Sequence, residues 1–449
     1  MIKIVKFGGS SVASSQQFQK VKDIVLADDS RRFVVVSASG KVNKDDNKIT
    51  DLLYLCHAHI KYNISCDHIF NMIEERFLTI KKELNLSYDI KKDLDLLRSQ
   101  LDKNIDLDYL VSRGEYLTAL LMAEHLGYEF VDAKDLIFFN YDGSIDYKKI
   151  KEAFDKIVND YPRLVIPGFY GSLPDGTLRI MSRGGGDVSG SIMANVVDAD
   201  VYENWTDVSG ILKADPRIVK KPKQIEVITY SELRELSYMG ASVLHEEAIF
   251  PVKHKNIPIH ILNTNDPTSA GTIIVDTVED EEANGNEITG IAGKKDFSII
   301  TVKKSHMSNE VGTIKNALDV LEKYSVSIEH LPTGVDSFSI VVESEAIKPI
   351  LYDVLLQIKE KCKPNELTVI DNISLIATVS RFMKSKTGMS GRLFTTLGRE
   401  NINISVISQT SDEMNIIVGV HNDDYERTIK AIYDEFEGNK GESKWKHTM

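Results

Sequence analysis

The C-terminal third of the chain repeats itself, and this repeat constrains the fold more than any other feature of the sequence. Residues 312–342 align without gaps with residues 388–418, at a shift of 76 positions. Each copy has the pattern of a strand, a loop with glycine, a helix, a strand, a turn and a strand. Two tandem copies predict two βαββαβ modules of the ferredoxin-like type. The paired positions include Gly312/Gly388, Leu321/Leu397, Val326/Ile402, Ile328/Ile404, Asp336/Asp412 and Ile340/Ile416.

Paired modules behind a larger N-terminal region suggest a sensor, and a scaffold for dimerisation is the alternative. Residues 276–287 (DTVEDEEANGNE) precede the modules and carry six acids and no base. Such a segment is typical of an exposed connection near a domain boundary. The tail, residues 438–449, is polar, and we expect it to fray. We therefore expect a large domain at 1–290 and modules at 291–370 and 371–449, with the C-terminal residues available to complete the first module.

The region before the repeat alternates between strand and helix patterns. Residues 32–39 (RFVVVSAS) form an apolar run that ends in small hydroxyl residues, and residues 163–167 (RLVIP) and 199–203 are further strands. Continuous apolar runs suit the buried strands of a parallel sheet. The alternation continues to about Val275 and predicts an α/β fold, with a mostly parallel sheet covered by helices on both faces.

The first strand leads into a turn that is suited to anions. The apolar run Ile2 to Val5 is followed by residues 6–12 (KFGGSSV). Glycines allow backbone N–H groups to approach a ligand, and a helix that opens at about Val12, capped by Ser10 or Ser11, would add its positive end. The spacing is not that of a Walker A loop. An ordinary strand-to-helix turn is the alternative, but the lysine at the end of the strand favours an anion cradle.

The most specific local motif is residues 180–190 (IMSRGGGDVSG), in which three glycines stand between Arg183 and Asp187. A loop that only turned would not need three glycines, whereas close contact between backbone and ligand would. Arginine suits a bidentate grip on a carboxylate, and an aspartate can hold an ammonium group. The pair therefore predicts a clamp for a zwitterion.

Two other segments are ambiguous when taken alone. Residues 112–115 (SRGE) precede an apolar helix at 117–123, so Glu115 reads most simply as an acid in the first turn of that helix. Residues 205–217 (WTDVSGILKADPR) follow a strand and contain two turns with aspartate. They suit either a plain surface loop or the lining of a nucleotide site.

Composition excludes several classes of protein. The chain has 449 residues, enough for two to four domains, and a formal charge of -13, which argues against a general binder of nucleic acid or anionic membranes. No stretch approaches the ~20 apolar residues of a membrane span. Lys3 and Lys6 interrupt the first apolar run, so a signal peptide is not expected. The three cysteines show no CxxC or zinc spacing, which indicates reduced, structural thiols and a cytoplasmic protein.

Together these motifs resemble those of the aspartokinases, in the amino-acid kinase family, nearly from end to end. The resemblance implies a three-layer αβα kinase domain followed by two ACT modules. The blocks that match in order are residues 6–12 (KFGGSSV), 112–115 (SRGE), 183–187 (RGGGD), 205–217 (WTDVSGILKADPR) and 240–245 (GASVLH), and residues 408–416 (SQTSDEMNI) resemble the second ACT module.

The resemblance also implies residue roles. Catalysis would depend on Lys6 and Asp187, with no metal bound by protein ligands alone. The contacts to aspartate would come from Ser39, Thr50, Glu115, Arg183 and Asp187. Those to ATP would come from Lys6, Gly8, Gly9, Ser10, Thr206, Asp207, Leu212, Arg217, Ser242 and Val243, with Mg²⁺ bound to the phosphates.

Four positions depart from the family pattern, so the contacts to adenine are less defined than those to aspartate. Gly186 stands where serine is frequent, Leu212 where a tyrosine can pack on adenine, and Ser242 where lysine is frequent. Glu246, after His245, replaces a proline.

The function implied by this resemblance is transfer of the γ-phosphoryl group of ATP to the β-carboxylate of L-aspartate, with feedback inhibition through the ACT modules and a homodimer or tetramer formed by them. Lysine is the expected effector, with threonine or both as alternatives, and its contacts would be Met307, Ser308, Gly312 and Glu329. The competing hypotheses are a glutamate or acetylglutamate kinase and a non-catalytic amino-acid sensor. A fusion to homoserine dehydrogenase is not expected, because no further domain follows the second module.

Overall fold

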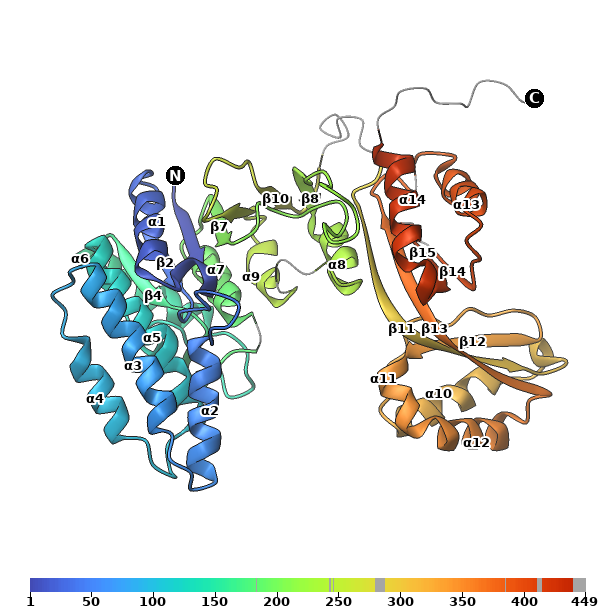
Figure 1. Cartoon of the computed structure of the whole chain (residues 1–449), viewed down its shortest axis with the longest axis horizontal. Coiled ribbons are helices and arrows are strands. Elements are labelled where there is room, and N and C mark those ends of the chain that lie inside the picture. Colours follow the sequence, from blue (N-terminus) through green and yellow to red (C-terminus); the bar gives the residue numbers. More distant parts are fainter. Residues whose placement is uncertain are drawn as a thin grey trace. The chain divides into compact units, whose positions relative to one another are not determined.

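The computed structural model describes residues 1–182, 184–241, 244, 246–278, 287–383, 385–409 and 414–438. The chain forms two compact units (Figure 1). The first comprises Met1–Ile211, Glu226–Tyr230 and Val243–Asp280, and the second Leu212–Ile225, Ser231–Ser242 and Glu281–Met449. Residues 279–286 of the acidic stretch, Asp412 of the repeat and the tail from residue 439 lie outside the described residues.

The first unit is built on a sheet with the strand order β3-β4-β2-β1-β7-β9-β10-β8 in the described residues. Neighbouring strands pair in parallel except β9 and β10, which are antiparallel. This confirms the mostly parallel sheet expected from the apolar runs. The strands are β1 (Lys3–Phe7), β2 (Phe33–Val36), β3 (Glu129–Phe130), β4 (Leu164–Pro167), β7 (Val201–Thr206), β8 (Val227–Thr229), β9 (Ile259–Asn263) and β10 (Thr272–Val275), with a separate hairpin of β5 (Tyr170–Ser172) and β6 (Leu178–Ile180).

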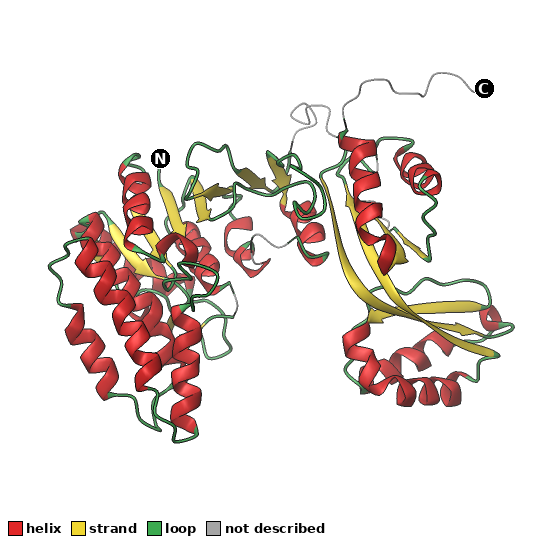
Figure 2. Ribbon diagram, in the orientation of Figure 1, coloured by secondary structure: helices red, strands yellow, loops and turns green. Residues whose placement is uncertain are grey.

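Helices cover both faces of this sheet. Alternate residues of a strand point to opposite faces, and Val5, Phe7, Val34 and Val36 share one hydrophobic core with helices α1 to α5. The intervening positions of β1 face helix α7, as the contact of Lys6 with that helix described below shows. The helices of the first unit are α1 (Ser15–Leu26), α2 (Ile49–Lys61), α3 (Asp67–Glu83), α4 (Ile90–Ser99), α5 (Leu107–Leu126), α6 (Tyr147–Asp160), α7 (Gly185–Val196) and α9 (Phe250–Lys253) (Figures 1 and 2). Helix α8 (Tyr230–Tyr238) belongs to the second unit from Ser231 onward.

Two expected helix starts are wrong. The segment Gly9–Val12 is a short 3-10 turn, and α1 begins at Ser15 with Ser14 as its N-cap, whose hydroxyl accepts from the Gln17 N–H. Helix α5 begins at Leu107, with Asp106 as its N-cap, so Glu115 lies in mid-helix rather than in a first turn. In both places the helix begins directly after a side chain, Ser14 or Asp106, that accepts a hydrogen bond from one of its free N–H groups.

The second unit contains a five-stranded sheet in the order β12-β11-β13-β15-β14 in the described residues. All its pairings are antiparallel. Helices α10 and α12 pack together, as do α13 and α14. The elements are β11 (Gly290–Lys303), α10 (Thr313–Lys323), β12 (Ser337–Glu343), α11 (Ser344–Ile347), α12 (Leu351–Cys362), β13 (Glu366–Val379), α13 (Met389–Arg399), β14 (Val406–Ser408), β15 (Asn415–His421) and α14 (Tyr425–Glu437).

The two long strands β11 and β13 join the repeats into one sheet (Figure 2). Residues 297–303 of β11 pair with β12 and with the first half of β13, whereas Gly290 to Lys294 pair with Leu375 to Val379. The second half of β13 also pairs with β15. The start of β11 therefore adds a strand to the second repeat.

The matched glycines of the repeat have the same structural role. Gly312 and Gly388 are the N-caps of α10 and α13, with φ of 94° and 90°. Residues with a Cβ rarely adopt this backbone conformation, so glycine marks the same helix start in both copies. The strand-loop-helix pattern of the repeat is confirmed at these positions.

The three cysteines lie in the core of the protein, as expected for structural thiols. Cys56, Cys66 and Cys362 are all buried and unpaired by disulfides. Over the part of the chain that the structure describes, no helix combines the length and the apolar character that crossing a membrane requires.

Candidate functional site

The turns that follow β1, β2 and β7 meet at the carboxyl edge of the first unit's sheet. The Gly8 N–H donates to the Trp205 carbonyl at 3.0 Å, and the Gly40 N–H donates to the Gly9 carbonyl at 2.9 Å. A Cβ on Gly40 would lie 2.5 Å from the carbonyl carbon of Gly9, so the two backbones approach too closely for any other residue. The carboxyl edge of a parallel sheet is where such folds bind ligands, and the expected anion cradle lies there.

Lys6 and Asp187, the two residues expected to be catalytic, form a nearly buried ion pair. The Lys6 Nζ lies 2.5 Å from the Asp187 Oδ1, and the side chains are 9% and 14% exposed. Asn204, which pairs with Lys6 across β1 and β7, donates to the same oxygen at 2.9 Å. The Tyr202 hydroxyl donates to the Asp187 carbonyl at 3.0 Å. The start of α7 is thereby tied to the centre of the sheet.

Sequence reasoning missed Asn204. Its signal was a polar residue in the strand sequence VYENWT, directly across from Lys6. That Asn204 lies beside Lys6 follows only from the strand order, which places β7 next to β1.

Gly186 allows a close approach beside the same ion pair. A Cβ there would lie 2.8 Å from the Ser37 Oγ and 3.4 Å from the Lys6 Cε. Glycine at this position, where the family often has serine, leaves room for both neighbouring side chains.

Glu115 is a buried carboxyl with an unsatisfied oxygen. It is 4% exposed, and in the described residues its Oε2 has no hydrogen-bond partner. Burial raises the pKa of Glu115 to about 8, although the Ala38 backbone donor and the charges of Arg113 and Lys6 act in the opposite direction. An unpaired buried carboxyl oxygen is costly for folding, so it marks a position suited to a polar ligand.

Ser39 and Thr50 lie on the framework next to Glu115. Ser39 is fully buried; its N–H donates to the Thr118 Oγ1 at 3.2 Å, and its Oγ donates to the Ala13 carbonyl at 3.3 Å. The Ile49 N–H, at the start of α2, donates to the Ser39 carbonyl at 3.1 Å, which places the partly buried Thr50 one residue further along. The expected aspartate contacts Ser39, Thr50 and Glu115 are thus brought together.

The residues expected to contact ATP are only partly gathered. Ser10 lies in the turn after β1, and Thr206 ends β7, where its Oγ1 donates to the Asp207 Oδ1 at 3.2 Å. Leu212 and Arg217 belong to the second unit. There Arg217 is exposed and makes a two-nitrogen contact with Asp215, at 3.0 and 2.6 Å. Arg183, Ser242, Val243 and His245 lie outside the described residues.

The expected effector residues lie in the first repeat of the second unit. Met307 is buried and its N–H donates to the Asp336 Oδ1 at 3.2 Å, whereas Ser308 is exposed. Glu329 accepts a hydrogen bond from the Tyr238 hydroxyl at 2.7 Å. Burial, and then this bond to Glu329, raise the pKa of Tyr238. Sequence reasoning did not find this partner of Glu329.

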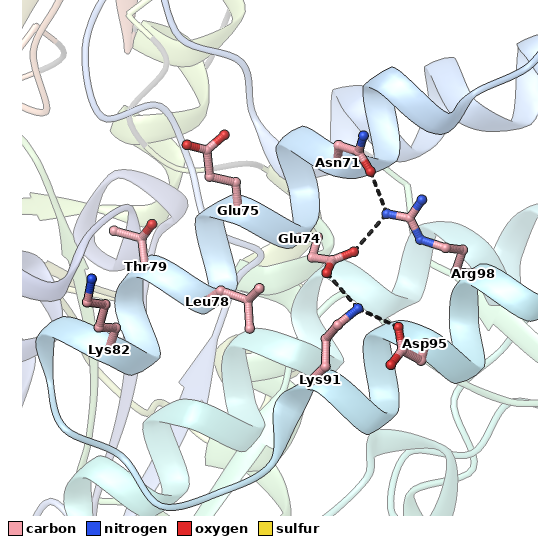
Figure 3. Close-up of a pocket in the computed structure, with 9 residues that line it drawn as sticks. All are labelled: Asn71, Glu74, Glu75, Leu78, Thr79, Lys82, Lys91, Asp95 and Arg98. Atoms are coloured by element: carbon pink, nitrogen blue, oxygen red, sulfur yellow. Dashed lines mark hydrogen bonds and ion pairs between the residues drawn. The ribbon is translucent and has the colours of Figure 1, made fainter.

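A cavity of about 650 Å³ between α3 and α4 contains none of the expected site residues (Figure 3). Four of its charged side chains bind one another: Glu74 contacts Lys91 and Arg98, both at 2.7 Å, and Lys91 also contacts Asp95 at 2.5 Å. Because these four charges are paired and no expected site residue lines the cavity, it is a solvated seam between two helices rather than a candidate site.

Comparison with known proteins identifies both parts of the chain. The model of the amino acid kinase family matches residues 1–263, and an ACT domain model matches residues 376–436. Aspartokinase 3 of Bacillus subtilis (strain 168) is 35% identical over 450 residues, which cover 97% of this chain and 98% of that protein. A bifunctional aspartokinase/homoserine dehydrogenase of Daucus carota is 29% identical over 476 residues, which cover 97% of this chain and 51% of that protein.

Solved structures agree with these matches. The aspartate kinase of Clostridium acetobutylicum is 47% identical, with a TM-score of 0.90 and coverage of 97% of this chain and 99% of that one. Aspartokinase III of E. coli in complex with lysine and aspartate is 23% identical, with a TM-score of 0.75 and coverage of 97% of this chain and 99% of that one. It shows the same fold.

Proposed function

The chain belongs to the amino acid kinase family, and we propose that within it the protein is an aspartate kinase, which transfers the γ-phosphoryl group of ATP to the β-carboxylate of L-aspartate. The observation that carries this proposal is the similarity to Bacillus subtilis aspartokinase 3 over 97% of this chain and 98% of that protein. The product of this transfer is 4-phospho-L-aspartate, an acyl phosphate.

The chemistry needs positive charge and alignment more than it needs a base. The attacking carboxylate has an ordinary pKa of ~4 and is already ionised at neutral pH. The barrier lies in bringing two anions together, so charge stabilisation and orientation are the main contributions of the protein. Lys6 and the backbone N–H group of Gly9 would contact the phosphates, beside Gly8, whose own N–H is bonded to the Trp205 carbonyl. The ion pair with Asp187 supports this role, because it holds the ammonium group of Lys6 at the edge of the sheet.

Mg²⁺ would enter this site with the nucleotide. Among the described residues no group of three or more His, Cys, Asp or Glu side chains is placed to hold a metal ion. Mg²⁺ bound mainly by phosphate oxygens needs few protein ligands, and it would neutralise part of the phosphate charge.

The amino-acid half of the site would consist of Ser39, Thr50 and Glu115, with Arg183 and Asp187 from the glycine-rich loop. The glycine-rich motif predicts that Asp187 holds the substrate ammonium group, but Asp187 is already bonded to Lys6 and Asn204, so the unpaired Oε2 of Glu115 is the better supported partner of that group. On the nucleotide side, Ser10 lies in the turn after β1. Thr206 is the last residue of β7, and Asp207 follows it. Leu212, Arg217, Ser242 and Val243 complete the proposed ATP contacts, on the strength of their places in the family motifs.

Regulation would come from the two ACT modules. Lysine is the proposed effector, since E. coli aspartokinase III, with the same fold, was crystallised with lysine and aspartate. Met307, Ser308, Gly312 and Glu329 are its proposed contacts, and the modules would also join subunits into a dimer or tetramer. The proposed domains are residues 1–290, 291–370 and 371–449, and the strand pairing of Gly290 to Lys294 with Leu375 to Val379 links the start of the first module to the last one.

The direct test is ADP release with L-aspartate, L-glutamate or N-acetylglutamate as the acceptor, with hydroxylamine added to trap an acyl phosphate as its hydroxamate. Aspartate-dependent ADP release with formation of the hydroxamate is the expected result. Turnover with glutamate or acetylglutamate in place of aspartate, or with no acceptor at all, would reject the proposal. Repeating the assay with lysine, threonine and both together identifies the effector.

A further inference from the structure

Arg76 on helix α3 reaches several segments that border the candidate site. Its Nη1 donates to the Gly40 carbonyl at 2.7 Å, to the Ser39 Oγ at 3.3 Å and to the Ala13 carbonyl at 3.5 Å. Its Nη2 forms an ion pair with the Asp46 carboxylate. The side chain is 14% exposed. A single guanidinium therefore connects the turn after β1, the turn after β2 and the loop before α2.

The loop of residues 41–48 depends on Asp46 for its inward contact. Asp46 is partly buried, whereas the other residues of this loop are exposed. It also accepts from the Val42 N–H at 2.7 Å, which closes the loop on itself. Burial raises the pKa of Asp46, but backbone donors from Val42 and Asn47 and the charge of Arg76 outweigh it and hold that pKa below its ordinary value. The carboxylate is therefore charged at neutral pH, as an ion pair requires.

Apolar packing beneath this loop is incomplete. A cavity of about 440 Å³ lies between the loop and α3, with Ala13, Val42, Asp46 and Arg76 among its lining residues. Where packing does not hold a loop, its position depends on its polar contacts. The bonds of Arg76 are thus the main link between this loop and the body of the first unit.

We propose that Arg76 is a positioning residue for the amino-acid substrate, which holds Ser39 and the start of α2, with Thr50, in the arrangement that binds aspartate. This inference rests on the proposed function. Within the described residues, Arg76 bonds at 2.7 and 3.3 Å to Gly40 and Ser39 and forms an ion pair with Asp46, and only its longest bond, at 3.5 Å, goes to Ala13 in the segment after β1. None goes to Lys6 or Asp187, so the stronger contacts of Arg76 support the amino-acid half of the site and the Lys6–Asp187 pair supports the phosphate half.

Arginine is specifically suited to this task. The planar guanidinium group presents donors in two directions at once. Its Nη1 can therefore donate to the Gly40 carbonyl while its Nη2 donates to Asp46. A lysine ammonium is a point charge on a flexible stem and can satisfy one of these partners well, but not all of them. Arg76→Lys is therefore expected to lie between the wild type and Arg76→Ala in its effect.

The first test compares Arg76→Ala with Arg98→Ala, a matched control. Arg98 is a partly buried arginine of α4, bonded to Glu74 at 2.7 Å and Asn71 at 2.6 Å, and among the described residues it contacts no segment of the site (Figure 3). In Arg76→Ala the KM for aspartate should rise about tenfold or more, the effect of one lost charge-assisted hydrogen bond, with the KM for ATP unchanged. In Arg98→Ala both KM values should stay at their wild-type levels while the Tm falls.

An unchanged aspartate KM in Arg76→Ala would overturn the proposal, as would an equal rise in the KM values for aspartate and ATP. Guanidinium ion added to Arg76→Ala should partly restore the aspartate KM, and the same addition should not improve the wild type. If Arg76→Ala fails to fold, the same comparison is made with Arg76→Lys and Asp46→Asn, each of which should raise the aspartate KM alone.

A second measurement does not depend on catalysis. Amide hydrogen exchange in the full chain reports the Val42 N–H, bonded to Asp46, and the Ile49 N–H, bonded to Ser39. Both should exchange faster in Arg76→Ala or Arg76→Lys than in the wild type, and at the wild-type rate in Arg98→Ala. Absence of aspartate turnover in the wild type would reject the proposed function, whereas wild-type exchange rates at Val42 and Ile49 in the Arg76 variants would reject the role of Arg76.

Discussion

Replacing Glu115 with glutamine should raise the free energy of unfolding at alkaline pH and weaken the binding of aspartate. Burial raises the pKa of Glu115 from 4.5 to about 8. Between these two values the folded protein holds a proton that the unfolded chain has released, so the free energy of unfolding falls as pH rises. The slope is ~1.4 kcal/mol per pH unit, and over this window the loss reaches at most ~5 kcal/mol.

Glutamine cannot ionise, so Glu115→Gln should lack this loss. Below about pH 4 the variant and the wild type should unfold alike, because Glu115 is then neutral in both the folded and the unfolded protein. At pH 9 the variant should be the more stable by a few kcal/mol. Urea unfolding across this pH range measures the difference.

Glu124→Gln, on the same helix, is the control with the opposite sign. Burial raises the pKa of Glu124, but hydrogen bonds from Ser87 and Tyr88 outweigh it and lower that pKa. A lowered pKa stabilises the fold above the ordinary value of the unfolded chain, and this contribution is lost as pH falls through the folded value. Glu124→Gln should therefore destabilise the protein at neutral pH.

The same pKa predicts how aspartate binding depends on pH. If the ionised form of Glu115 binds the substrate ammonium group, the wild-type KM for aspartate should rise up to tenfold for each pH unit below 8. In Glu115→Gln that KM should be high and nearly independent of pH. A wild-type KM that does not change between pH 6 and 8, together with no gain in stability for the variant at pH 9, would refute the reasoning for Glu115.

Three further predictions concern other parts of the chain. Lys6→Met should lower kcat by at least about a hundredfold with little change in the aspartate KM, because its charge, held beside Asp187, matters most as the phosphoryl group moves; steady-state kinetics would show the opposite pattern if Lys6 only bound substrate. Glu329→Gln should raise the lysine concentration for half-inhibition without changing uninhibited turnover, and an identical inhibition curve would limit Glu329 to its structural hydrogen bond. Gly40→Ala should destabilise the protein by several kcal/mol in urea unfolding, because its Cβ would meet the backbone of Gly9; wild-type stability would show that the turn can shift.

Much of the fold could be read from local patterns. Phe33 to Val36 form a buried central strand, as the apolar run predicted, because a parallel strand covered on both faces must be apolar along its length. Gly312 and Gly388 start equivalent helices, because a left-handed backbone conformation restricts the residue type at one position. Lys6 and Asp187 were proposed as catalytic because they stand in glycine-containing motifs, which carry their own chemical signal, whereas Ser39, Thr50 and Glu115 were proposed only by resemblance to the family.

Tertiary structure alone decided the rest. The pairing of Asp187 with both Lys6 and Asn204 depends on β7 lying next to β1 and on α7 packing against that pair. The raised pKa of Glu115 depends on burial in mid-helix, where its sequence suggested an acid in the first turn of a helix. Arg76 lies in a charged and amphipathic helix, where the sequence alone predicts a solvated arginine. Only the structure shows its hydrogen-bond acceptors on three other segments. Periodicity and residue type predict which face of one segment is buried. The ion pair of Lys6, the raised pKa of Glu115 and the contacts of Arg76 instead depend on atoms of distant segments, which only the strand order and the helix packing bring close together.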